Sequence, residues 1–188
     1  MMMKLIAALG FVLLSASQSI AQNAVAGARD FDWEMGVWET TVRVRAPLDP
    51  DAAWTTFEGV SDIRPVSDGR ANMVDLDVAA GGGARIQGVS LRLFNPRTGQ
   101  WSLTFASMRD GVLTAPVYGG FVGGRGVFHG QDAVDGRMVL VRFVISDVTA
   151  TSARFVQSYS SDGGRTWIDN WIATDVRRPA APGDQAGT

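Results

Sequence analysis

The chain has 188 residues, 46% of them hydrophobic, with a formal net charge of −2, a single histidine and no cysteine. The missing cysteines exclude disulfides, thiolate catalysis and thiolate metal sites, so stability has to come from packing. The chain has no block of basic residues, so it lacks the electrostatic footprint of a nucleic-acid-binding protein.

The first 21 residues have the layout of a secretory signal peptide. Lys4 supplies a positive charge, Leu5 to Leu14 form an apolar run, and small residues precede Gln22. A retained membrane anchor is the alternative interpretation, but the run is shorter than the roughly 20 apolar residues that span a bilayer. No cysteine follows it for lipid attachment. We therefore expect a periplasmic or secreted mature protein that begins at Gln22 and has no membrane span.

Turn-forming residues recur at nearly even spacing along the rest of the chain. Clusters of Gly, Pro, Asn and Asp occur, for example, at 49–51, 67–69, 81–83, 95–99, 110–111, 135–136 and 162–164. The segments between them favour β-strands. A meander of about 9–10 such strands is expected to close on itself or to fold into two sheets, because open sheet edges are a liability. The sequence thus predicts an all-β, antiparallel up-and-down barrel spanning 22–178, with helix confined to a short turn near 30–35. The Pro/Gly/Ala-rich tail, 179–188, is expected to be disordered.

Alternation of residue types assigns side chains to faces of these strands. Val89, Leu91 and Leu93 face one way, with Ser90 and Arg92 between them. Four other sets are each predicted to share a face: Trp101, Leu103 and Phe105; Val139, Val141, Phe143 and Ile145; Phe155, Gln157 and Tyr159; and Ile168, Asn170, Ile172, Thr174 and Val176.

Two short motifs stand at the ends of this pattern. Gly36-Val37-Trp38, at the entry to the first strand, resembles the Gly-x-Trp signature of lipocalin-like (calycin) barrels. That resemblance implies that Trp38 closes one end of the barrel under an arginine from the last strand, either Arg177 or Arg178. Ser160 to Trp167 matches the Asp-box pattern of sialidase-type propellers. Its single copy is interpreted as a hairpin staple, in which an aspartate accepts backbone N–H bonds across a glycine turn.

Taken together, these motifs make the chain similar to a family of bacterial lipocalin-like (calycin-type) barrel domains of unknown function. The resemblance rests on three segments, Gly36 to Trp38, Leu91 to Trp101 and Ser160 to Trp171. It implies the fold across nearly the whole mature chain and carries over no activity.

His129 is the only histidine, and it lies beside a turn in Phe128-His129-Gly130. Some related small barrels bind haem through one histidine, but a solvated residue at a strand end is the more common role for such a position. No second histidine or cysteine accompanies it, and no Asp-x-Asp-x-Asp loop for Ca²⁺ is present. We therefore expect no metal site and no cofactor.

The last two hairpins suggest where a ligand would bind. If they turn around 149–151 and 163–164, Phe143, Gln157 and Asn170 lie side by side on the apolar face, with Tyr159 two positions along. Polar groups inside a barrel need partners, which a small-molecule ligand could provide, although they could also satisfy one another. The candidate ligand-binding residues are Gln157, Tyr159, Asn170, Phe143 and Trp101.

The same register places Arg142, Ser158 and Asp169 together on the opposite face, where we expect a solvent-side ion pair. A slip of one residue would exchange the two faces. Arg142, Asp169 and His129 are therefore the fallback site candidates.

Three functions remain open at this point. An exported barrel could bind a small apolar or aromatic molecule, with tryptophans as walls. A cofactor-independent lyase, isomerase or hydratase could use a Tyr, Asp or Arg in the pocket, although this rests on analogy between folds. A structural protein of the cell envelope would require an apolar patch on the outer surface. The oligomeric state and the identity of the ligand do not follow from the sequence.

Overall fold

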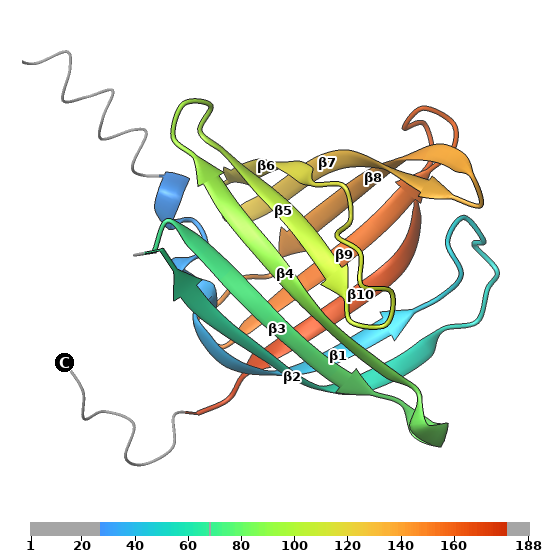
Figure 1. Ribbon diagram of the computed structural model, residues 1–188, viewed down its shortest axis with the longest axis horizontal. Helices are drawn as coiled ribbons and strands as arrows, with labels where there is room; N and C mark the ends of the chain where they lie inside the picture. The colour runs from blue at the N-terminus through green and yellow to red at the C-terminus, as the bar shows by residue number, and fades with distance from the viewer. Residues whose placement is uncertain (1–26, 68, 180–188) are drawn as a thin grey trace, which may run out of the picture.

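The computed structural model describes residues 27–67 and 69–179 (Figure 1). Ten antiparallel strands form a closed barrel, in which each strand pairs with its neighbours in the chain and the last strand pairs with the first. The strands are β1 (Gly36–Val44), β2 (Thr55–Val66), β3 (Ala71–Ala79), β4 (Arg85–Asn95), β5 (Gln100–Ser107), β6 (Val117–Val122), β7 (Arg125–Val134), β8 (Arg137–Ser146), β9 (Ser152–Ser160) and β10 (Ile168–Arg177). The predicted all-β, up-and-down barrel is confirmed.

Some of the predictions concern residues beyond the described ranges. The signal peptide, the mature N-terminus at Gln22 and the tail from 180 onward all lie outside them. Within residues 27–67 and 69–179, no helix has the length and apolar character needed to cross a membrane.

The segment that precedes β1 crosses one end of the barrel, where it is the blue ribbon at the left of Figure 1. It contains two short 3₁₀ helices, η1 (Gly27–Arg29) and η2 (Asp32–Glu34), which match the expected helical turn near 30–35. Phe31 is 1% exposed and makes edge-to-face contacts with Trp101 and Phe121, at ring-centroid distances of 4.8 and 5.0 Å. This end of the barrel is therefore closed by an aromatic cluster. A third 3₁₀ turn, η3 (Gly81–Gly83), joins β3 to β4.

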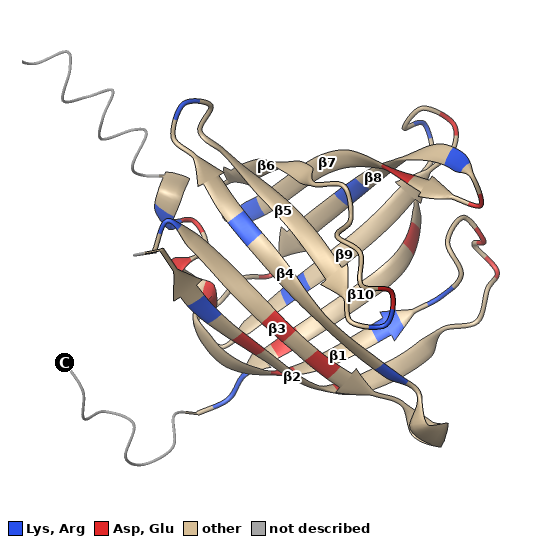
Figure 2. Cartoon of the chain, in the orientation of Figure 1, with Lys and Arg blue, Asp and Glu red and all other residues tan. Residues whose placement is uncertain are grey.

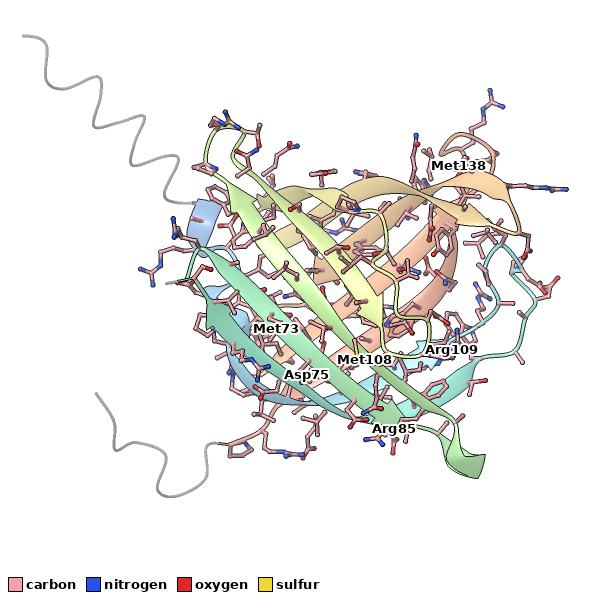
Figure 3. The ribbon with its side chains drawn as sticks, viewed as in Figure 1. Met73, Asp75, Arg85, Met108, Arg109 and Met138 are labelled. Carbon is pink, nitrogen blue, oxygen red and sulfur yellow. The ribbon has the colours of Figure 1, made fainter. Side chains whose placement is uncertain are left out.

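The opposite end carries the longer connections, including the one between β5 and β6. These two strands pair only from Trp101–Gly119 to Leu103–Val117. Beyond that point residues 108–116 fill the gap, and the Thr114 hydroxyl accepts a hydrogen bond from the Phe105 amide at 3.0 Å. Figure 3 shows Met108 and Arg109 on this connection. At this end, the loop between β5 and β6 forms the part of the barrel wall that the two strands leave open.

Strand β4 turns Val89, Leu91 and Leu93 outward, while Ile86 and Phe94 pack against the core. Leu93 is 47% exposed, whereas Arg92 is only 8% exposed and faces the interior. Gly88 explains this arrangement, because a Cβ atom there would lie 2.1 Å from the Phe105 ring of β5. The ring needs a glycine beneath it on the inner face, and this places Ser90 and Arg92 on the inner face too.

Strand β10 contains a β-bulge at Asn170, where Asp169 pairs with Ser158 but Trp171 pairs with Gln157. Beyond the bulge Trp171, Ala173 and Asp175 face inward. The prediction that Ile172, Thr174 and Val176 share the inner face with Ile168 and Asn170 is therefore wrong; Val176, for example, is 51% exposed. Arg45, in the loop between β1 and β2, stabilises the bulge with two hydrogen bonds. Its backbone N–H donates to the Asn170 carbonyl at 3.0 Å, and its side-chain Nε donates to the Asp169 carbonyl at 2.6 Å.

Charged residues of both signs are interspersed over the strands and turns in Figure 2.

Candidate functional site

The barrel encloses a cavity of about 270 Å³. Inward-facing side chains from most strands line it, together with Trp33 and Glu34 from the closing segment and Thr114 and Ala115 from the β5–β6 connection. Most of the wall is apolar, with large aromatic contributions from Trp33, Trp38, Phe105, Phe143, Phe155 and Trp171. An apolar cavity with a few polar groups is the usual form of a small-molecule site.

Trp38 forms the floor of the cavity at the closed end. Its ring is 1% exposed, its indole N–H donates to the Glu34 carbonyl at 2.6 Å, and the guanidinium carbon of Arg177 lies 4.1 Å from the ring centroid. Arg177 also donates to the carbonyl oxygens of Met35 (2.6 Å), Ala150 (2.8 Å) and Trp33. The predicted plug is confirmed, and Arg177, not Arg178, covers it.

Arg92 is buried beside the floor of the cavity, where a carboxylate neutralises its charge. Its guanidinium forms an ion pair with Glu34, and its carbon lies 4.6 Å from the centroid of the Phe31 ring. Burial lowers the pKa of Arg92 to about 9. Even so, the side chain stays protonated at neutral pH, and its charge is balanced locally by Glu34.

Asp175 occupies the next inward position above the floor, opposite Thr40 of β1 and Ala153 of β9. The Thr40 hydroxyl lies 2.7 Å from Asp175 Oδ1 and 2.8 Å from the Ser61 hydroxyl. Because a hydroxyl carries one hydrogen, Thr40 donates to the carboxylate and accepts from Ser61. Burial raises the pKa of Asp175, while the hydrogen bond from Thr40 and the charge of Arg92 lower it in part.

A second polar group lies farther from the floor, on β7, β9 and β10. The Tyr159 hydroxyl donates to Asp132 Oδ2 at 2.9 Å. The Gln157 amide donates to the Tyr159 oxygen and to Asn170 Oδ1, both at 3.2 Å. Burial and the neighbouring Asp132 raise the pKa of Tyr159 above its ordinary value. Tyr159 therefore stays protonated at neutral pH and acts there as a hydrogen-bond donor.

The five predicted ligand-binding residues occupy different surroundings. Phe143, Gln157 and Tyr159 line the cavity, and Phe143 pairs with Gln157 across β8 and β9 as the turn position predicts. Asn170 sits at the bulge, 7% exposed, and reaches the cavity only through Gln157. Trp101 belongs instead to the aromatic cluster at the closed end, where its indole N–H donates to the Gly27 carbonyl at 2.8 Å. Contact of these residues with a ligand stays a prediction.

The three fallback candidates lie on the outer surface of the barrel. His129 pairs with Arg142 across β7 and β8, and the Arg142 guanidinium carbon stacks 4.3 Å from the Trp167 ring centroid. Asp169 accepts a hydrogen bond from Ser158 at 2.6 Å. The expected ion pair between Arg142 and Asp169 is therefore replaced by two separate contacts. His129 is exposed and belongs to no cluster of metal-ligating residues within the described parts of the chain.

The Asp-box acts as a hairpin staple between β9 and β10. Asp162 accepts hydrogen bonds from the amides of Arg165 and Thr166 at 3.0 Å and from the Thr166 hydroxyl at 2.7 Å. These bonds lower the pKa of Asp162. Gly163 and Gly164 adopt positive φ angles of 75° and 88°, which glycine tolerates best. Turn formation thus accounts for the aspartate, the glycines and the threonine of this motif.

The charged residues of the cavity, Glu34, Arg92, Asp132 and Asp175, were not among the predicted site residues. Arg92 could have been noticed, because it interrupts the apolar residues of the Leu91–Trp101 segment. Asp175 could not, because the bulge reverses the face on which it lies. Glu34 precedes the first strand, and only the path of the chain across the barrel end brings it inside.

No family model matches the sequence, and no curated protein matches it. Among solved structures, the S-type phycobiliprotein lyase from Guillardia theta aligns with a TM-score of 0.59 at 12% identity, over 89% of this chain and 100% of that one. A de novo designed fluorescence-activating β-barrel aligns with a TM-score of 0.43 at 11% identity, over 78% of this chain and 95% of the design. The similarity to the lyase, at this low identity, is one of fold. The protein is a ten-stranded antiparallel barrel of the lipocalin-like kind.

Proposed function

We propose that the barrel binds one small, predominantly apolar or aromatic molecule in its central cavity. The observation that carries this proposal is the cavity itself, about 270 Å³ of space inside a closed barrel. Ligand pockets range from roughly 300 to 1,000 Å³, so the occupant belongs at the small end of that range. Barrels of this size are wide enough to hold one small ligand.

The lining explains why such a molecule would be selected. Aromatic side chains supply flat apolar walls; Phe143 and Phe155, for example, pack edge to face at a centroid distance of 5.0 Å. The polar groups sit in two places, around Asp175 and around Tyr159. A few fixed polar groups in an apolar wall orient a ligand and give it specificity.

Filling the cavity tests this proposal. Ala173 faces inward opposite Phe155 and is 7% exposed, whereas Thr174 faces outward. Ala173→Phe should abolish binding of 1-naphthylmethanol, measured by titration calorimetry, at a stability cost of about 1–3 kcal/mol for overpacking. Thr174→Phe is the matched control and should leave binding unchanged. Equal binding by the two variants would place the ligand outside the cavity. Native mass spectrometry of the purified protein would identify any molecule that it already holds.

We also propose that the protein is exported. The support is the arrangement of Lys4, the apolar run from Leu5 to Leu14 and the small residues before Gln22. N-terminal sequencing of protein from the periplasm or the medium should begin at or near Gln22. Recovery of a chain with intact Met1 from a membrane fraction would contradict this proposal.

A catalytic role for the same cavity is the second candidate, and Asp175 favours it. A carboxylate held in an apolar cavity with a raised pKa is a common general acid or base. If mass spectrometry finds a ligand, incubating that ligand with the protein tests this role. Turnover that is lost in Asp175→Asn would support an enzyme; a ligand recovered unchanged would support a binding protein.

A further inference from the structure

We propose that the ligand is an organic cation, a small aromatic amine whose ammonium group binds Asp175 while its ring packs against the aromatic walls. This inference rests on the proposed function, because it assumes that the cavity holds a ligand. It adds the charge and the orientation of the bound molecule.

The first argument is the charge of the lining. Among the residues that line the cavity, Glu34, Asp132 and Asp175 bring carboxylates, and Arg92 brings an inward guanidinium. Arg154 also borders the cavity, but it lies between the inward residues Ala153 and Phe155, and strand alternation turns its side chain outward. The interior therefore has an excess of negative charge.

The second argument is that the positive groups near the cavity are already engaged. Arg92 is paired with Glu34 and stacked on Phe31. Arg177 lies behind the Trp38 ring and donates to the carbonyl oxygens of Trp33, Met35 and Ala150. No ion pair joins Asp175 to either arginine within residues 27–67 and 69–179, although Arg92 attracts it at longer range.

The third argument is the geometry at Asp175. Its Oδ1 accepts the Thr40 hydroxyl at 2.7 Å, and Thr40 is in turn fixed by Ser61 at 2.8 Å. No donor in the described ranges bonds to Oδ2, so the carboxylate has an oxygen available to the cavity that it borders. An unpaired carboxylate in an apolar space is costly, and a cation from the ligand would offset that cost.

The fourth argument is the surface around this carboxylate. Trp38 is the inward neighbour of Thr40 on β1, and Phe155 is the inward neighbour of Ala153, which pairs with Asp175. Aromatic faces attract ammonium groups and also pack well against aromatic rings. A carboxylate acceptor beside such faces is the usual chemistry of amine recognition, while an anionic ligand would have to displace Glu34 from Arg92.

Three probes with the same ring test the proposal: 1-naphthylmethylamine, 1-naphthylmethanol and 1-naphthoate, each titrated into the full protein by calorimetry at pH 7. The amine should bind at least about tenfold more tightly than the alcohol, given the usual strength of desolvated ammonium contacts. Naphthoate should bind most weakly. In Asp175→Asn the amine should lose this advantage while the alcohol binds as before, and Asp62→Asn, an exposed aspartate of β2, is the matched control.

The outcomes separate this inference from the proposed function. If the alcohol binds as tightly as the amine, or naphthoate binds best, the cation inference is overturned while a ligand-binding cavity stands. If none of the three binds, the proposed function and this inference are both contradicted for ligands of this size. Should Asp175→Asn fail to fold, as judged by circular dichroism, the order of affinities in the unaltered protein still decides.

Discussion

Two charged residues stand at successive inward positions of β10 and have opposite roles. Arg177, at the closed end, covers Trp38 and donates hydrogen bonds to three carbonyl oxygens of neighbouring segments. Asp175, one step into the cavity, has a partner for one carboxylate oxygen only. A charge that is fully used by its own chain stabilises the fold, whereas a charge with unused bonding capacity in a cavity is available to a ligand.

Removing the plug tests the structural side of this contrast most strongly. Trp38→Ala should lower the free energy of unfolding by about 3–5 kcal/mol, because a large buried aromatic ring is lost from the core. Urea unfolding followed by circular dichroism would measure the loss. Trp54→Ala, which removes a tryptophan stacked on Arg43 and Arg45 near the surface, is the control and should cost less. A loss below about 1 kcal/mol for Trp38 would mean that it does not plug the barrel.

Removing Arg177 should have the next largest effect. Arg177→Ala should cost about 2–3 kcal/mol, because hydrogen bonds to charged groups are stronger than ordinary ones and three carbonyl oxygens lose a donor. Arg178→Ala is the matched control. Arg178 is exposed, and its Nε lies 3.7 Å from Glu39 Oε1. We expect this variant to change the free energy of unfolding by no more than about 0.5 kcal/mol. Equal losses in the two variants would refute the assignment of Arg177 as the covering residue.

Replacing Asp175 should have the smallest effect on the free energy of unfolding, and the replacement should not destabilise the protein at neutral pH. Its pKa is raised in the folded protein, so its contribution to stability is greatest below the unfolded value near 3.8 and is lost as the pH rises through the folded pKa. Asp175→Asn should therefore leave the free protein at least as stable as the parent at pH 7.

Asp162 has a lowered pKa in the folded protein, so its contribution to stability is present above 3.8 and is lost as the pH falls. Asp162→Asn should destabilise at pH 7, and melting temperatures across pH would reveal these opposite signs.

The β8–β9 hairpin shows what local sequence can determine. The turn residues 149–151 place Phe143 opposite Gln157, and the structure has this pair. Turn position and the two-residue period of a strand suffice there, since nothing interrupts the ladder.

Strands β4 and β10 show where local sequence fails. The orientation of β4 depends on Gly88 making room for the ring of Phe105, a residue of another strand. The bulge at Asn170 depends on Arg45, which holds its carbonyl from a loop more than a hundred residues earlier. Both causes are contacts between segments distant in the chain, and both decide which polar residues face the cavity. The fold was therefore predictable, while most of the charged lining was not.

The bulge also makes the lining of the cavity sensitive to the length of the chain. Downstream of Asn170, one face of β10 carries Trp171, Ala173 and Asp175, and the other carries Ile172, Thr174 and Val176. Loss of one residue between Trp171 and Asp175 would shift the rest of the strand by one position and exchange the two faces from that point on. Deletion of one codon there would thus turn Asp175 out of the pocket and bring Val176 into it, while Glu34, Arg92 and Asp132 keep their places on other segments.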